Sequence, residues 1–318
     1  MNILILSAGT RNLLVSYFMK SGFDKVVAAD ASPLAPALYL ATKYYIVPLM
    51  KDPSYMDRIL DICKSESIDA VLPLQEDELQ LIADNAGLFE KNGIKVIVSD
   101  SRSVSACRDK FGFLDALTKA GIPVLKTYCD IDAFRKDIDE GLVSFPVFIK
   151  PRFGCGSADS FMAGNIEFID AVRKNYNEEF VIQQFNKGRE YGADIYCDLI
   201  TGEVTDIFLK EKLRMRAGET EKSISVINEA VFDLVKKTVS LFDFRGPIDM
   251  DLFEMDGTYY VSEINPRFGG GYPHAYLCGV NFPLRILENL KGNSGDCSIG
   301  DYKAGMIALK TQDILLAP

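Results

Sequence analysis

The stretch Val261-Ser262-Glu263-Ile264-Asn265-Pro266-Arg267, preceded by Asp249-Met250-Asp251, decides how the chain is interpreted. Alternate side chains of a β-strand share a face, so Glu263, Asn265 and Arg267 are predicted to point the same way. Carboxylate and amide oxygens suit a hard cation such as Mg²⁺, which keeps several waters and binds phosphate. A guanidinium adds planar donors for a phosphate group. The stretch therefore indicates nucleotide phosphate chemistry.

The upstream acids are predicted to lie on the neighbouring strand of an antiparallel hairpin that turns at Asp256-Gly257. A two-residue loop would place Asp251 on the face opposite Glu263. A three-residue loop with Gly257 in the left-handed conformation places Asp249, Asp251 and Glu263 on one face, and a metal site requires this loop. The alternative is a solvated acidic face of an edge hairpin. The metal site is favoured because acids that converge without a cation repel one another.

Length and composition indicate a soluble protein of two or three domains. The chain has 318 residues, of which 48% are hydrophobic and 25% are charged. The net charge of −10 argues against a general nucleic-acid binder. No apolar run approaches the length of a membrane span, and residues 1–7 have no basic leader, so they are predicted to form a first strand.

Cysteine and histidine usage narrows the chemistry further. The seven cysteines form no CxxC pair and are odd in number, which is typical of reduced cytosolic thiols. His274 is the only histidine, so mechanisms that need two histidines are excluded, and a histidine-rich zinc site is disfavoured. No GxSxG elbow accompanies it.

The first hundred residues alternate strand and helix patterns, as in a doubly wound parallel sheet. Strands are predicted over 3–6, 25–29, 44–47, 70–73 and 95–98, and helices over the segment that ends at residue 20, over 54–65 and over 76–89. Gly9 follows the first strand and Asp30 lies about 20 residues on, as in dinucleotide sites. The GxGxxG triplet is absent, so a dinucleotide site is disfavoured.

Two further units are predicted after a polar break over 99–108. The second contains a helix over 109–120, a strand over 145–150, a helix over 167–176 and a strand over 180–184. The third contains a β-meander over 190–210, a helix over 226–242, the acidic hairpin and a last strand over 302–309.

A glycine-containing loop follows Lys150 at the end of a predicted strand. Gly154 and Gly156 let backbone N–H groups approach a phosphate closely, and Ser157 adds a donor. The lysine supplies a point charge for a phosphate oxygen. The loop is not a P-loop, because GxxxxGK[ST] is absent. An ordinary flexible hairpin loop is the alternative interpretation.

The order of these parts resembles the ATP-grasp superfamily over nearly the whole chain. The similarity is greatest to carboxylate–amine ligases that are carbamoyl-phosphate-synthase-large-subunit-like or pyrrolysine-biosynthesis-ligase-like. The resemblance implies an α/β and α+β fold in three parts. These are a Rossmann-like pre-ATP-grasp domain over 1–106, a small lobe that acts as a lid over 107–187, and a large lobe with the metal site over 188–318.

The resemblance also implies roles for particular residues near the nucleotide. Lys110 and Lys150 would contact the phosphates, and the loop Gly154–Ser157, including Gly156, would close over them. Gln183 stands where many relatives have a glutamate near the adenine. The backbone groups of Gln184 and Phe185 would bind the base, and Glu190 would bind the ribose.

The metal and transfer roles follow in the same way. Asp251, Glu263 and Asn265 would hold Mg²⁺, with Mn²⁺ as an alternative, and Arg267 would steady the transferred phosphate together with Lys150. Asp249 is the alternative metal ligand to Asp251, since we expect it to lie directly across from Glu263.

The implied activity is that of an ATP- and Mg²⁺-dependent carboxylate–amine ligase that works through an acyl phosphate. Its partners would be a small carboxylate, such as an amino acid, and an amine, in the cytoplasm, without nucleic acid or membrane. A homodimer is compatible with this prediction. Two alternatives stay open: a small-molecule kinase of the same fold and a non-catalytic nucleotide-binding module.

Two other groups have open roles. Lys210, Arg214 and Arg216 are interpreted either as contacts to phosphate or an acidic substrate, or as a solvated basic face. Gly269–Gly271 and His274 are interpreted either as a substrate-carboxylate site or as an ordinary turn with a structural histidine.

Overall fold

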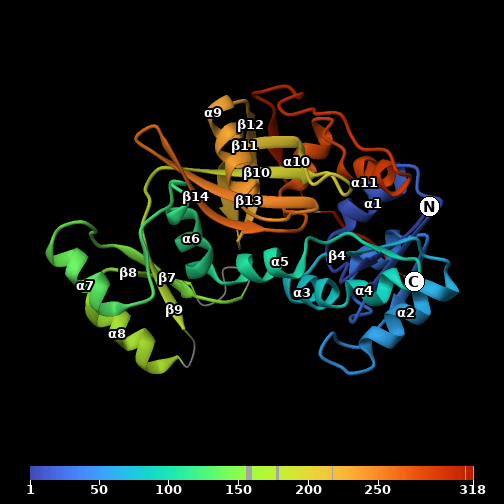
Figure 1. Cartoon of the computed structure of the whole chain (residues 1–318), viewed down its shortest axis with the longest axis horizontal. Helices are drawn as coiled ribbons and strands as arrows, with labels where there is room; N and C mark the ends of the chain where they lie inside the picture. The colour runs from blue at the N-terminus through green and yellow to red at the C-terminus, as the bar shows by residue number, and fades with distance from the viewer. Residues whose placement is uncertain (155–159, 177–178, 217, 312, 318) are drawn as a thin grey trace.

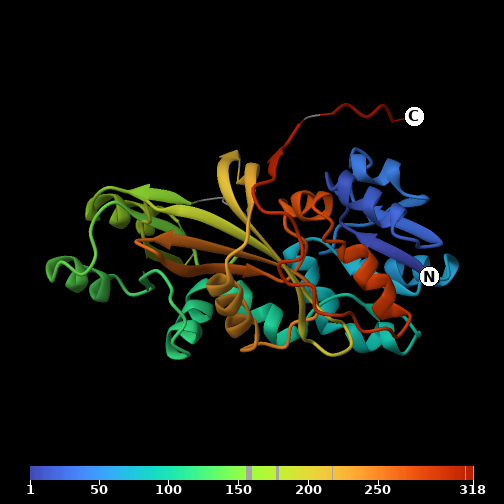
Figure 2. The same ribbon diagram turned by 90° about the horizontal axis from the view of Figure 1, so that it is seen from above.

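Three β-sheets organise the chain in the computed structural model, which describes residues 1–154, 160–176, 179–216, 218–311 and 313–317. A five-stranded N-terminal unit lies at one end, and a four-stranded small lobe lies at the other. The six-stranded sheet of the large lobe lies between them (Figures 1 and 2). The predicted combination of α/β and α+β architecture is confirmed. The predicted boundaries at 106/107 and 187/188 stay predictions.

The N-terminal unit is a parallel sheet in the order β3-β2-β1-β4-β5. Its central strand, β1 (Asn2–Leu6), buries Ile3 and Ile5 in one apolar layer and Leu4 and Leu6 in another. A strand that is covered on both faces is expected in a doubly wound sheet, so that prediction is confirmed. The other elements are β2 (Lys25–Asp30), β3 (Lys43–Ile46), β4 (Ala70–Pro73), β5 (Lys95–Val96), α1 (Asn12–Lys20), the 3₁₀ helix η1 (Pro36–Leu40), α2 (Tyr55–Ser65), α3 (Glu76–Asp84) and α4 (Ala86–Glu90).

Residues 99–108 contain a helix and not the predicted polar break. Asp100 caps α5 (Ser101–Arg108) by accepting a hydrogen bond from the Ser103 N–H at 3.1 Å. Asp109 caps α6 (Lys110–Lys119) in the same way, from the Gly112 N–H at 3.1 Å. These consecutive caps place Lys110 at a helix start, as predicted.

The small lobe is a sheet in the order β6-β9-β7-β8. Its core joins Val147 and Ile149 of the sheet to Phe134, Ile169 and Val172 of two helices. The first of these helices, α7, was not predicted from the sequence. The elements are β6 (Thr127–Tyr128), α7 (Ile131–Asp139), β7 (Val147–Pro151), β8 (Phe161–Ala163), α8 (Ile166–Asn175) and β9 (Phe180–Gln184).

The large lobe is a sheet in the order β14-β13-β10-β11-β12-β15. The predicted helix over 226–242 is shorter, because Asn228 caps it by accepting from the Val231 N–H at 3.3 Å. Strand β12 was not predicted. The elements are β10 (Arg189–Cys197), β11 (Val204–Arg216), β12 (Glu219–Val226), α9 (Glu229–Val239), β13 (Gly246–Met255), β14 (Thr258–Asn265), α10 (Tyr272–Leu277), α11 (Phe282–Leu290) and β15 (Ile307–Leu309).

Helices α10 and α11 pack against α1 and so join the large lobe to the N-terminal unit (Figure 1). The rings of Tyr17 and Tyr276 stack with centroids 3.7 Å apart. Phe268, Tyr272 and Phe282 share one apolar core with the N-terminal sheet. Among the described residues, none of the helices combines the length and apolar character that crossing a membrane requires.

The acidic hairpin of β13 and β14 brings Asp251 and Glu263 onto one face, as predicted, but the extra residue does not lie in the turn. Met255 pairs with Thr258, so the loop has two residues, Asp256 and Gly257, both at positive φ (52° and 79°), as in a type I′ turn. The predicted three-residue loop is wrong. A β-bulge supplies the extra residue instead, because Leu252 pairs with Val261 whereas Asp251 pairs with Glu263.

The bulge at Ser262 brings Asp251 and Glu263 onto one face, as a metal site at this hairpin requires. Asp249 pairs with Asn265, so the expectation that it lies directly across from Glu263 is wrong.

Candidate active site

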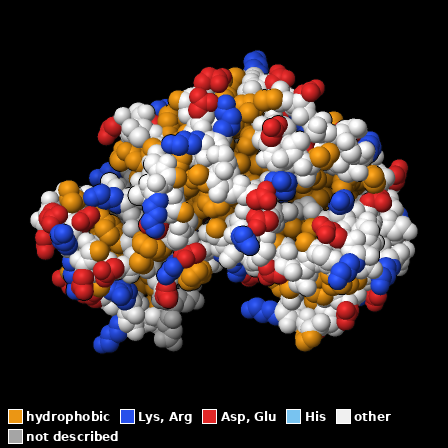
Figure 3. All heavy atoms as spheres, in the orientation of Figure 1, with side chains coloured by type: hydrophobic (Ala, Val, Ile, Leu, Met, Phe, Trp, Pro, Cys, Tyr) orange, Lys and Arg blue, Asp and Glu red, His pale blue; other side chains and the backbone are white. Residues whose placement is uncertain are grey.

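A cavity of about 630 Å³ lies where the three parts of the chain meet. On the face seen in Figure 3, acidic and basic side chains are interspersed, and the outline is hollowed between the small lobe and the N-terminal unit. Most of the predicted site residues line the cavity: Lys110, Lys150, Gly154, Gln183, Glu190, Asp251, Glu263, Asn265 and Arg267. Gly156 and Ser157 lie outside the described residues.

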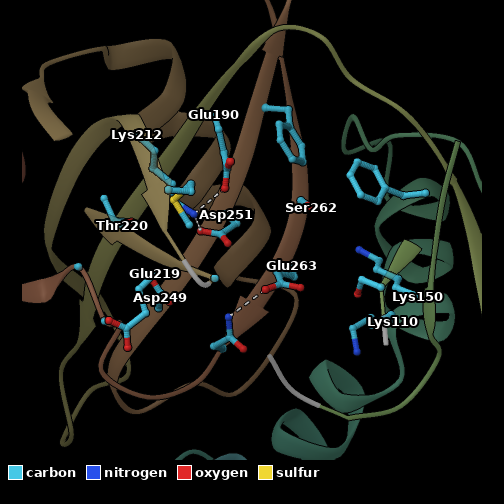
Figure 4. Close-up of a pocket in the computed structure, with 18 of the residues that line it drawn as sticks. Lys110, Lys150, Glu190, Lys212, Glu219, Thr220, Asp249, Asp251, Ser262 and Glu263 are labelled. Carbon is cyan, nitrogen blue, oxygen red and sulfur yellow. Dashed lines mark hydrogen bonds and ion pairs between the residues drawn. The ribbon is translucent and has the colours of Figure 1, made fainter. Parts of the chain in front are cut away.

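Carboxylates gather on the large-lobe wall of the cavity (Figure 4). The Lys212 ammonium donates to Glu190 at 2.8 Å and to Asp251 at 2.7 Å. The Asn265 amide donates to Glu263 at 3.4 Å. Burial raises the pKa of Asp251, and repulsion from neighbouring acids adds to the shift, although Lys212 opposes it.

These oxygen donors fit a hard cation in kind. Among the described residues, however, no three His, Cys, Asp or Glu side chains lie close enough together to form a ready metal cage. This agrees with the chemistry of Mg²⁺, which takes one or two carboxylates and completes its shell with water and phosphate oxygens. Asp249 is already engaged, because it accepts from Arg267 at 3.1 Å.

Two lysines of the small-lobe side face the acidic hairpin across the cavity (Figure 4). Lys110 donates to the Gly154 carbonyl oxygen at 2.6 Å, and Lys150 donates to the Gln183 side-chain oxygen at 3.0 Å. Burial lowers the pKa of Lys150. Gln183 also donates to the Thr127 hydroxyl at 3.0 Å, which fixes its orientation.

The two residues after Gln183 lie outside the cavity lining. The Gln184 N–H donates to the Lys126 carbonyl oxygen at 2.9 Å, so this N–H is already hydrogen-bonded within the protein. The Phe185 ring packs near that of Phe148, with centroids 5.5 Å apart. The predicted contacts of Gln184 and Phe185 with the base therefore stay predictions.

Arg267 is held by carboxylates from two parts of the chain. It donates to Glu76 of the N-terminal unit at 2.9 Å and to Asp249 of β13 at 3.1 Å. Its side chain is 14% exposed and still borders the cavity. The N-terminal unit thus positions this guanidinium.

Three basic residues of β11, namely Lys210, Arg214 and Arg216, have different surroundings. Lys210 is buried in an ion pair with Asp194, beside Gly271. Arg214 and Arg216 are exposed and pair with Glu221 at 2.8 and 3.5 Å, outside the cavity lining. The solvated-face interpretation therefore fits Arg214 and Arg216 better than contact with a ligand in this cavity.

His274 has a structural environment. Its ring contacts the Ser223 hydroxyl at 2.8 Å and the Met306 carbonyl oxygen at 3.1 Å, and it does not line the cavity. Burial and the charge of Lys210 lower the pKa of His274 to about 4. Gly270 and Gly271 do border the cavity, so the glycine run and the histidine have different surroundings.

Two cations that line the cavity, Arg11 and Lys212, were not predicted, and neither was Glu76, which contacts Arg267 from outside the cavity lining. Lys212 follows Lys210 at the two-residue spacing of one strand face, which is the signal that the sequence offered. Arg11 precedes α1 and Glu76 is the first residue of α3, so both lie just after the carboxyl ends of β1 and β4, the edge where doubly wound sheets bind ligands.

The comparisons with known proteins agree with this arrangement. A family profile for the PylC-like N-terminal domain matches residues 3–97, and one for the ATP-grasp domain matches residues 107–271. The carbamoyl phosphate synthase large chain of Agathobacter rectalis is 24% identical over 302 residues, which cover 86% of this chain and 27% of that protein. The chain thus spans about a quarter of the length of such relatives.

Two solved structures share the fold. The N5-carboxyaminoimidazole synthetase of Staphylococcus aureus gives a TM-score of 0.73 at 18% identity, covering 97% of this chain and 79% of that one. The biotin carboxylase domain of Hydrogenobacter thermophilus 2-oxoglutarate carboxylase, solved with MgADP, gives 0.75 at 15% identity, with coverages of 96% and 73%.

The ATP-grasp profile spans more than half of the chain, and the relatives' names are those of synthases and carboxylases. The predicted class, an ATP-grasp enzyme of the ligase type, is therefore confirmed at the level of the family. This chain belongs to the ATP-grasp domain family.

Proposed function

We propose that the chain is an ATP- and Mg²⁺-dependent carboxylate–amine ligase that works through an acyl phosphate. One observation carries the proposal. A single cavity brings Lys110 and Lys150 opposite Asp251 and Glu263, with Arg267 on the same lining. Cations for phosphate and oxygens for a hard metal thus converge, as phosphoryl transfer requires.

The nucleotide would lie between the small lobe and the hairpin. Lys110 and Lys150 would bind its phosphates, Gln183 would lie near the base, and Glu190 would bind the ribose. The MgADP in the Hydrogenobacter thermophilus relative supports this assignment by analogy.

Asp251, Glu263 and Asn265 would hold the metal. Asp249 shares their face of the hairpin, and its hydrogen bond from Arg267 is the reason to keep it as the alternative ligand. When bound, Mg²⁺ neutralises charge that develops on the phosphates. Lys212 donates to one oxygen of Asp251, which leaves the second carboxylate oxygen for the metal.

The proposed chemistry has two steps. A substrate carboxylate oxygen attacks the γ-phosphorus, ADP leaves, and an acyl phosphate forms. An amine then attacks the acyl carbon, an amide forms, and phosphate leaves with the loss of one proton from the amine. Arg267 would steady the transferring phosphoryl group, held at that position by Glu76 and Asp249.

The test begins with ADP release, assayed over small carboxylates and amino acids, singly and in pairs. We expect Glu263→Gln to lower ADP formation about a hundredfold or more, because one anionic metal ligand is lost from a partly exposed position. Asp256→Asn is the matched control, since it removes a carboxylate from the exposed turn of the same hairpin.

Unchanged activity in Glu263→Gln would refute the metal assignment. Product analysis separates the alternatives: free phosphate with an amide supports the ligase, whereas a stable phosphorylated product identifies a kinase. Tight ATP binding without turnover on any carboxylate would identify a binding module.

A further inference from the structure

Arg11 is a cation of the cavity lining to which the proposed function assigns no role. Arg11 lies in the turn between β1 and α1 and lines the cavity beside Gly270. In the described part of the chain its guanidinium makes no hydrogen bond or ion pair. Burial and the nearby charge of Arg267 lower the pKa of Arg11. A largely enclosed guanidinium without a partner needs an anion to compensate its desolvation.

The nearby acidic side chains of the protein do not supply this anion, because each already has another partner. Glu76 and Asp249 both accept hydrogen bonds from Arg267. Glu219, the third nearby acid, pairs with Lys310. Arg11 is thus surrounded by carboxylates that already have partners.

Glu219 borders the same small space as Arg11. A Cβ atom built on Gly270 would lie 3.7 Å from Arg11 Nη1 and 3.9 Å from Glu219 Cγ and Cδ. Thr220, the next residue of β12, also lines the cavity and lies beside Gly271. We name Arg11, Glu219, Thr220 and Gly270 the Arg11 subsite.

We propose that the Arg11 subsite binds the α-amino-acid substrate of the ligase, with Arg11 on its carboxylate and Glu219 on its ammonium. This inference rests on the proposed function and names the substrate class of that site. Guanidinium and carboxylate geometries match in a bidentate pair. A zwitterion satisfies both charges, whereas a dicarboxylate would meet the repulsion of Glu219, and a simple amine would leave Arg11 unpaired.

Gly270 keeps the space between the two charges open. A methyl group there would meet Arg11 and Glu219 at ordinary contact distances, so Gly270→Ala is compatible with the fold while it obstructs the ligand. Gly269 differs, because a Cβ atom there would lie 2.5 Å from an Asp249 oxygen. The chain therefore offers a mild variant that tests the subsite without disturbing the Asp249–Arg267 pair.

The experiment measures ADP release with ATP, Mg²⁺ and each of the common amino acids, in L and D forms, singly and in pairs. Bicarbonate, acetate and succinate serve as carboxylates without an ammonium group. We expect amino acids to stimulate ADP release, and the α-amide and Nα-acetyl derivatives of an active amino acid to be at least tenfold poorer.

Substitutions in the Arg11 subsite test whether the amino acid binds there. We expect Arg11→Met, and separately Gly270→Ala, to raise the KM for the amino acid at least tenfold, with a smaller change in the KM for ATP. Arg11→Lys should recover part of the loss. Arg58→Met, at an exposed arginine of the same unit, is the control and should leave the amino-acid KM within twofold.

An unchanged amino-acid KM in both Arg11→Met and Gly270→Ala would overturn the inference. Stimulation by bicarbonate, acetate or succinate, with none by amino acids, would also overturn it, while the ligase proposal would stand. No ADP release with any carboxylate would refute the ligase proposal and the substrate assignment together.

Discussion

Lys212 shows how a single side chain shapes the site before any ligand arrives. Its ammonium donates to Glu190 and Asp251, and its side chain is only 5% exposed. Lys150 was predicted from its local glycine-loop motif, and Lys110 from the resemblance to ATP-grasp proteins. Lys212 was not, because its contacts cross from β11 to β10 and β13, and only the register of the sheet reveals them.

Replacing Lys212 with Met should lower stability by about 1–3 kcal/mol, because two partly buried carboxylates lose their cation. The loss should be smaller with magnesium chloride than with EDTA, since a bound cation would compensate Asp251. Thermal melting under both conditions measures this difference. Lys222→Met, at an exposed lysine of β12, is the control and should show no such dependence. An equal loss of stability in both solutions would argue against a metal at Asp251.

The acidic hairpin shows what a strand pattern can and cannot reveal. The alternation of acids and apolar residues predicted two paired strands, and their existence is confirmed. The sequence could not show where an extra residue enters the ladder. A longer loop and a bulge both bring Asp251 and Glu263 onto one face, and the chain uses a bulge at Ser262.

The type I′ turn requires a positive φ at Gly257, where φ is 79°. A Cβ atom built on Gly257 would meet no atom within 4 Å. Gly257→Ala should therefore destabilise the protein by about 1 kcal/mol through backbone strain alone. Gly87, in helix α4, also has open space but no positive φ. Gly87→Ala should stabilise by about 0.5–1 kcal/mol. Urea denaturation of both variants checks the opposite signs, and a shared sign would contradict the turn assignment.

The three sheets contribute jointly to one cavity, and this arrangement was only half visible in the sequence. Strand and helix periodicity predicted the parallel sheet and the acidic hairpin, the glycine loop pointed to Lys150, and the resemblance to ATP-grasp proteins implied the two lobes. The contributions of Arg11 and Glu76 depend on how the N-terminal unit packs against α10 and α11, over sequence separations that local patterns do not cover.

The stability of the chain should depend on pH through Glu78, which is fully buried near β1 in the N-terminal unit. It accepts from Ser7 at 2.9 Å and from Tyr55, while its second oxygen has no partner in the described residues. Burial raises the pKa of Glu78 from 4.5 to about 7, so the folded state holds this proton more tightly than the unfolded state.

Its contribution is therefore fully present below about pH 4.5 and is lost as pH rises to about 7, on the order of 3 kcal/mol. Glu78→Gln should flatten this decline. Urea denaturation of both proteins at several pH values between 5 and 8 measures the slopes, and parallel slopes would refute the shift.

The bond between Glu76 and Arg267 has a consequence for anyone who builds chimeras of this chain. Arg267, two residues after the end of β14, carries a guanidinium whose alignment depends in part on Glu76, the first residue of α3 in the N-terminal unit. A graft that joined residues 107–318 to a foreign Rossmann-like partner would keep every nucleotide and metal motif and the contact with Asp249, but it would lose one of the two acids that align this arginine. Such a hybrid should regain the second contact when its new partner carries an acid at the position that corresponds to Glu76.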